Sequence, residues 1–136
     1  MRVTWAYDCG DHRDTHEVDT TDPTAFDRLL RQIHERDEPV VVTIYDEPTG
    51  DTDDLPPGVQ IGLGHATHAF IVHITDDGGY DTDPGVPAPA TAISFDLGGV
   101  PTEYPAENLR LRPETAIQKA VAFLRAGGSP VSPPPA

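Results

Sequence analysis

The sequence predicts an α+β domain in which about five to seven strands form a mostly antiparallel β-sheet and two amphipathic helices pack against it. Two segments carry apolar residues at helical spacing, and several short apolar runs separated by turn residues lie between them. The order strand, helix, hairpin-linked strands, helix favours an α+β arrangement. The 136 residues suit one domain. We expect it to span residues 1–130, with a flexible proline-rich tail at 131–136.

The first helix is predicted from Pro23 to about Arg36. Asp22 is a favourable N-cap, and proline is well tolerated at the first helical position. Ahead of Pro39, the apolar residues share one helix face at the spacing i, i+3, i+4, i+7; they are Phe26, Leu29, Leu30 and Ile33.

The second helix is predicted from about Pro113 to Ala126. Pro113 again suits the first position, and Glu114 places a negative charge in the first turn, where the helix dipole favours it. Gly127 and Gly128 are expected to end the helix. Its apolar face consists of Ala116, Ile117, Ala120, Val121, Phe123 and Leu124.

The strands are predicted from β-branched runs and alternating patterns. The β-branched run 40–45 is too continuous for an edge strand, so we place it at the centre of the sheet. The segments 59–64 and 68–75 are expected to form a hairpin. The Asp- and His-rich segment 8–21 and the segments 46–58 and 81–89 are expected to be connections. The other predicted strands are 2–7, a short one around Tyr80, 91–97 and 100–105.

Net charge is the clearest compositional signal. The chain has 23 acidic and 9 basic residues and a formal net charge of −14. Such a field repels nucleic acid and anionic membranes, and it favours a basic partner whose encounter it accelerates. The acidity could equally serve solubility alone, or reflect a salt-tolerant or high-GC source.

Several features predict a cytoplasmic protein. Cys9 is the only cysteine, which excludes an internal disulfide and suits a reducing compartment. No apolar run is long enough to span a bilayer, and residues 1–5 lack the pattern of a secretion signal.

No residue set in the sequence matches a known catalytic or metal-binding pattern. His68 and His73 lie on opposite faces of a predicted strand, so a three-histidine metal site would need His65 and partners from elsewhere. His12 and His16 lie in a segment without helical character. Cys9 is surrounded by acids, which disfavour a thiolate. The Asp-Thr-Asp segments 51–53 and 81–83 lack the glycine and glutamate of a calcium loop. We therefore expect no cofactor, no metal and no enzyme activity.

The chain resembles the Imm1 family of bacterial immunity proteins from polymorphic toxin systems. The resemblance begins with the opening helix and central strand, Asp22-Pro23…Phe26…Leu29-Leu30 and 40–45. It continues through Gly62-Leu63-Gly64 and the strand 69–75 to Phe95-Asp96-Leu97-Gly98-Gly99 and Glu103-Tyr104-Pro105. It ends with the second helix, Gly127 and Pro130, so that it covers about residues 21–130.

The resemblance implies that the chain binds and neutralises one cognate toxin as a heterodimer. Imm1-like proteins are often paired with nucleic-acid deaminase toxins and sometimes with nucleases. Such enzymes need a basic groove, to which an acidic protein is complementary. We expect two acidic segments to bind the toxin, with Tyr80 as an anchor: Asp46, Glu47, Asp51, Asp53 and Asp54 in the first, and Asp76, Asp77, Tyr80, Asp81 and Asp83 in the second. Trp5, Phe26, Tyr45 and Phe123 are expected in the core.

Two other classes of function stay open at this stage. A small metal-dependent enzyme or binder would use the histidines and the loop acids, and metal analysis of the purified protein would reveal it. A generic acidic adaptor or DNA mimic would need carboxylates regularly spaced along one face, whereas the acids of this sequence are scattered among its loops.

Overall fold

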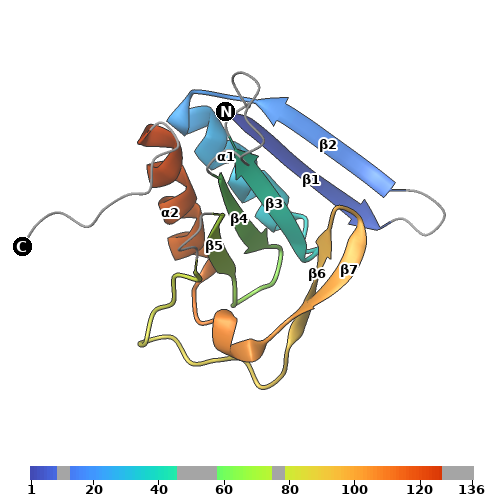
Figure 1. Cartoon of the computed structure of the whole chain (residues 1–136), viewed down its shortest axis with the longest axis vertical. Helices are drawn as coiled ribbons and strands as arrows, with labels where there is room; N and C mark the ends of the chain where they lie inside the picture. The colour runs from blue at the N-terminus through green and yellow to red at the C-terminus, as the bar shows by residue number, and fades with distance from the viewer. Residues whose placement is uncertain (9–12, 46–57, 75–78, 127–136) are drawn as a thin grey trace, which may run out of the picture.

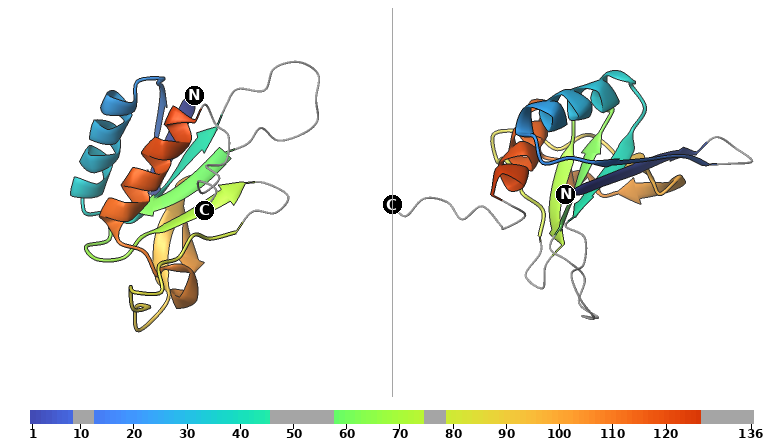
Figure 2. Two further views of the ribbon diagram at one scale, coloured as in Figure 1. Left: turned by 90° about the vertical axis from the view of Figure 1, so that its left-hand side faces the viewer. Right: turned by 90° about the horizontal axis from the view of Figure 1, so that it is seen from above.

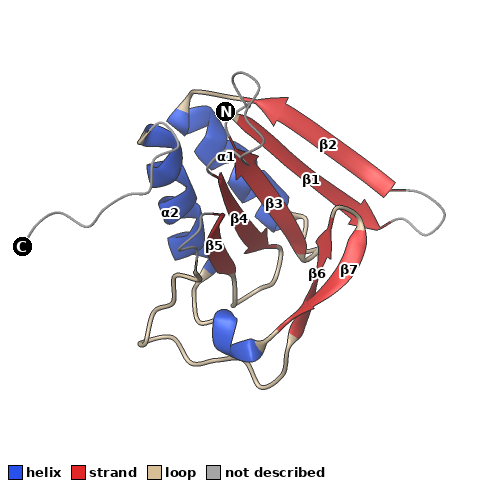
Figure 3. Cartoon of the chain, in the orientation of Figure 1, coloured by secondary structure: helices blue, strands red, loops and turns tan. Residues whose placement is uncertain are grey.

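The computed structural model describes residues 1–8, 13–45, 58–74 and 79–126, in which seven strands form one sheet beside two α-helices (Figures 1 and 3). Every strand pairing is antiparallel except a parallel one between β3 and β6. This confirms the predicted fold class. In chain order the elements are β1 Arg2–Asp8, β2 Arg13–Asp19, α1 Pro23–Glu35, β3 Val40–Tyr45, β4 Gly58–Leu63, β5 Phe70–Ile74, β6 Ile93–Leu97, β7 Val100–Tyr104, a short 3-10 helix η1 Ala106–Asn108, and α2 Pro113–Arg125.

The ends of α1 follow from local chemistry. The carboxylate of Asp22 accepts a hydrogen bond from the backbone N–H of Thr24 at 3.0 Å, as an N-cap does. Asp37, just past the helix, has a φ of 60°. Asparagine and aspartate tolerate this left-handed conformation better than other non-glycine residues, so the helix can end here without glycine.

Both helices cover one face of the sheet (Figure 2). Alternate residues of β1, β3 and β4 point towards them, and Val3, Val42 and Ile61 are fully buried in this layer. The predicted core residues Trp5, Phe26 and Phe123 are confirmed as buried. Tyr45 is only half-buried.

The β6–β7 hairpin packs on part of the opposite face and makes a second apolar cluster (Figure 2). Phe70 lies at its centre, with its ring stacked on Tyr104 at 4.4 Å between centroids and edge-on to Phe95 at 5.2 Å. Gly62, opposite Phe70 in the β4–β5 register, leaves the space that this ring occupies, because a Cβ there would collide with it. Gly64 has a φ of 95° and lies against the backbone of Glu38.

The structure corrects the expectation that residues 8–21 form an irregular connection, because residues 13–19 form β2. Strand β2 pairs with β1 along seven residues, from Arg2↔Asp19 to Asp8↔Arg13. Its acids and histidine have low strand propensity, but an edge strand with one neighbour tolerates charge. The ring of His16 also stacks on Trp5, with centroids 5.0 Å apart.

The remaining strand predictions are confirmed with small shifts of their ends. The expected β4–β5 hairpin is present, with Gly58↔Ile74 and Gly62↔Phe70 as its outermost pairs. The second strand of that hairpin starts at Phe70, so the placement of His68 on a strand was wrong. The short strand expected around Tyr80 is a single bridge to Val72.

Candidate functional site

The two acidic segments predicted to bind a partner join the sheet at one end. Tyr45, Gly58 and Ile74 lie side by side in the register of β3, β4 and β5. In the chain, residues 46–57 lie between Tyr45 and Gly58, and the second acidic segment follows Ile74. The predicted contacts Asp46, Glu47, Asp51, Asp53, Asp54, Asp76 and Asp77 lie outside the described residues.

Tyr80 is held against the protein by the second apolar cluster. It forms the bridge to Val72, and its half-buried ring lies edge-on to Phe70 at 5.9 Å. This packing fixes the backbone at residue 80 beside β5. It leaves only part of the Tyr80 ring available to a partner.

Asp81 and Asp83 bind within the chain. The Oδ2 atom of Asp81 lies 3.3 Å from Nε2 of His73 and 3.7 Å from Nζ of Lys119 on α2. The Oδ1 atom of Asp83 accepts a hydrogen bond from the N–H of Gly85 at 2.8 Å, closing a turn. Both acids therefore shape the loop, and both retain exposed surface.

Charge is divided unevenly between the helices and the rest of the chain. The two α-helices together contain three acids and four bases: Asp27, Glu35 and Glu114 against Arg28, Arg31, Lys119 and Arg125. The other 20 of the 23 acids lie in strands and connections. The net negative charge of the chain therefore comes from residues outside the two α-helices.

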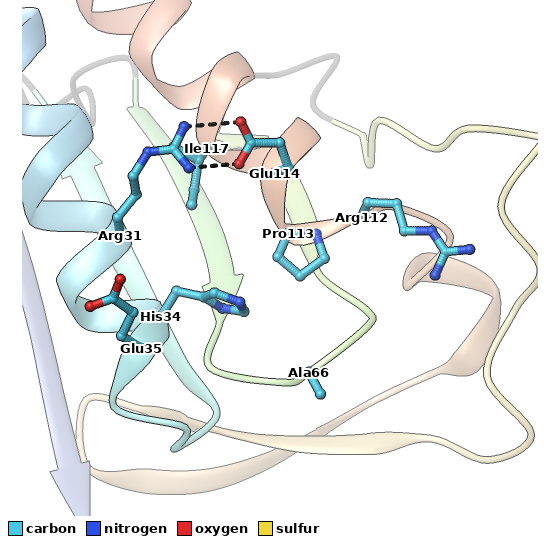
Figure 4. A pocket seen from close by; sticks show the side chains of 8 residues that line it. All are labelled: Arg31, His34, Glu35, Ala66, Arg112, Pro113, Glu114 and Ile117. Carbon is cyan, nitrogen blue, oxygen red and sulfur yellow. Dashed lines mark hydrogen bonds and ion pairs between the residues drawn. The ribbon is translucent and has the colours of Figure 1, made fainter.

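A cavity of about 310 Å³ lies between the two helices (Figure 4). Arg31 and Glu114 meet across it in a bidentate pair with N···O distances of 2.7 and 3.0 Å. This pairing lowers the pKa of Glu114. The pair fastens α1 to α2. The other lining residues are His34, Glu35, Ala66, Arg112, Pro113 and Ile117.

The second cavity, of about 290 Å³, lies where the sheet divides. One edge of β3 pairs with β1 at Thr43 and with β6 at Val40, so the β1–β2 and β6–β7 hairpins diverge from it (Figure 1). We call this cavity the fork cleft. It is lined by Thr4, Trp5, Ala6, Thr15, Val41, Thr43, Leu97 and Gly98. Sequence analysis missed these residues, because only the pairing of distant strands brings them together.

The histidines serve local contacts. Nδ1 of His65 accepts hydrogen bonds from the N–H groups of Thr67 and His68, each at 3.2 Å, and burial lowers the pKa of His65. Nε2 of His16 lies 3.0 Å from Asp14, a contact that lowers the pKa of this acid. Cys9 and His12 lie outside the described residues. Within the described part of the chain, no three His, Cys, Asp or Glu side chains converge as metal ligands would.

Residues 14–134 match the family described as immunity protein Imm1. The match covers most of the chain. The chain belongs to the Imm1 family. No curated protein and no solved structure matches it.

The Imm1 motifs now have structural explanations. Gly62 of the Gly-Leu-Gly segment makes room for Phe70, and Gly64 permits the close approach of Glu38. Gly98 and Gly99 have φ angles of 60° and 82°, which close the β6–β7 turn. An Imm1 protein is an immunity protein and binds a cognate toxin. Neither described helix has the length and apolar character needed to cross a bilayer.

Proposed function

We propose that this Imm1 protein binds and neutralises one toxin domain that acts on nucleic acid, either a deaminase or a nuclease, and that an acidic surface makes the contact. The family match over residues 14–134 carries the proposal. The net charge of −14 supports the nature of the toxin, because enzymes that bind nucleic acid present basic grooves. The protein acts in the cytoplasm, as one domain in a 1:1 heterodimer.

The distribution of charge supports the part of the proposal that concerns the surface. Seven of the 23 acids, and no base, lie in the segments 46–57 and 75–78. These segments join the sheet at neighbouring strand ends. The other three predicted contact residues, Tyr80, Asp81 and Asp83, follow the second segment in the chain.

The proposal is tested with the toxin domain encoded beside this chain. Purified toxin domain is titrated with the Imm1 protein, and its activity on DNA or RNA is measured. We expect activity to fall to zero at one equivalent, with a Kd of about 1 nM or below. Full activity in the presence of excess Imm1 protein, at low salt and micromolar concentrations, would overturn the proposal. A DNA-mimic protein would instead inhibit unrelated nucleic-acid enzymes equally well.

A further inference from the structure

The fork cleft is built by four strands. Thr4 and Ala6 come from β1, Thr15 from β2, Val41 and Thr43 from β3, and Leu97 from the end of β6. Residues 3, 5 and 7 of β1 and 40, 42 and 44 of β3 are packed in the helix-side core. Their neighbours therefore face the other side of the sheet, where the cleft lies.

The lining of the cleft suits a long side chain with a polar end. Val41 and Leu97 supply apolar surface, and three threonines supply hydroxyl groups that both donate and accept hydrogen bonds. Thr4 and Thr43 are half-buried, and Thr15 is exposed. An arginine or lysine fits this lining, because its aliphatic stem packs on apolar surface while its charged head is solvated by hydroxyls.

The tip of the β6–β7 hairpin leaves an apolar side chain exposed beside the cleft. Val100 pairs with Leu97, which lines the cleft, and it is 47% exposed. Phe95 and Tyr104, on the same side of this hairpin, are buried against the sheet. Val100 therefore lies on the same side of the hairpin as these two rings, but the sheet does not cover it.

Exposed carboxylates lie on the cleft side of the β1–β2 hairpin. Glu17 and Asp19 share the face of β2 that carries Thr15, and their side chains are 54% and 67% exposed. Nε of Arg2 lies 2.9 Å and 3.4 Å from their carboxylates, so these two acids share one base among the described side chains. A second copy of this chain has the same net charge of −14 and would be repelled.

From this geometry we infer that the fork cleft receives a basic segment of the toxin domain, with one arginine or lysine inserted between the two hairpins and an apolar contact on Val100. This inference rests on the proposed function and adds the fork cleft to the acidic segments as a contact surface. The exposed carboxylates of Glu17 and Asp19 orient the segment, and the threonines bind the inserted charged group.

The test compares matched substitutions on the two sides of the sheet. Thr15→Arg places bulk and positive charge at the cleft on an exposed strand position, and Gln32→Arg makes the same charge change on the exposed face of α1. Toxin-domain affinity is measured by calorimetry after circular dichroism confirms folding. We expect Thr15→Arg to weaken binding at least 100-fold and Gln32→Arg to change it less than 3-fold.

A second variant guards against a misfolded Thr15→Arg. Thr43→Val keeps the shape and strand propensity of the side chain and removes only the hydroxyl, so it should fold and weaken binding about 10-fold. Wild-type affinity in both cleft variants, or equal losses in Thr15→Arg and Gln32→Arg, would overturn the inference while the proposed function stands. Absence of binding by the unmodified protein would overturn the proposed function itself.

Discussion

The two faces of the sheet differ in how they are covered and in the charge around them. On one face, α1 and α2 bury Val3, Val42 and Ile61 completely. These two helices contain four basic and three acidic residues. On the other face, the β6–β7 hairpin covers Val41 and Phe70, while Thr4 and Thr43 remain partly exposed.

We infer that the helix-covered face serves folding stability and that the other face serves toxin binding. The helix-covered face contains most of the buried apolar side chains, and those are the groups whose removal costs most folding free energy. The partly covered face keeps a cleft and an exposed Val100, and we propose it as a docking surface. Substitutions on the two faces should therefore have different consequences.

The largest effect on folding is expected in the helix-side core. Phe26 is fully buried between α1 and the sheet. Phe26→Ala should lower the free energy of unfolding by about 3–5 kcal/mol, because it removes apolar burial and leaves a cavity. Urea unfolding followed by circular dichroism measures this loss, and Gln32→Ala on the exposed side of the same helix serves as the control. A loss below about 1 kcal/mol would mean that α1 does not pack as described.

A smaller loss of stability is expected in the second cluster. Gly62→Ala forces a Cβ into the ring of Phe70, so we expect about 1–3 kcal/mol of destabilisation from overpacking. Adding Phe70→Leu should recover part of that loss, because the smaller side chain vacates the space of the ring. The same urea measurement checks both variants. Additive losses in the double variant would contradict the proposed collision.

A kinetic effect should distinguish the charges of the two faces. Glu17→Gln combined with Asp19→Asn should slow association with the toxin domain about two- to five-fold at low salt, because exposed charges steer encounter. Asp27→Asn combined with Glu35→Gln removes two acids from α1 and should leave the rate nearly unchanged. Stopped-flow mixing at several salt concentrations makes the comparison. Equal slowing by the two pairs would show that net charge alone sets the rate.

The smallest effect concerns the ion pair that joins the helices. Arg31 holds the pKa of Glu114 below its ordinary value of 4.5. A lowered pKa means that the pair stabilises the folded state above the unfolded-state pKa, and that this stabilisation disappears as the pH falls through the folded-state pKa. Glu114→Gln should therefore have a slightly lower Tm than the unmodified protein at pH 7. The gap should close in strongly acidic buffer, and a gap that persists there would contradict the pairing.

The sequence was sufficient to predict elements that depend on local chemistry. The spacing of Phe26, Leu30 and Ile33 defines the buried stripe of α1, and Asp22 with Pro23 marks its start. The continuous β-branched run of β3 correctly predicted a central strand, and the structure shows that its neighbours include β1 and β4. These features rest on short-range spacing, which a single sequence shows directly.

Features that depend on distant pairing could not be predicted in the same way. Strand β2 has the composition of a loop, and it becomes a strand because β1 pairs with its backbone and Trp5 stacks on His16. The fork cleft arises because β3 shares one edge between β1 and β6, more than 80 residues apart in the chain. Of the predicted contact residues, Tyr80, Asp81 and Asp83 are placed by the structure, and their role in binding stays a prediction.

The central claim is that the toxin domain binds the fork side of the sheet and not the helices. A titration of isotope-labelled Imm1 protein with unlabelled toxin domain, followed by amide NMR spectra, tests this claim most directly. We predict that the largest shift changes fall on Thr4, Thr15, Thr43 and Gly98, and that Arg28, Gln32 and Gln118 on the exposed helix faces stay unchanged. Changes concentrated on the helices, with the fork residues unaffected, would contradict it.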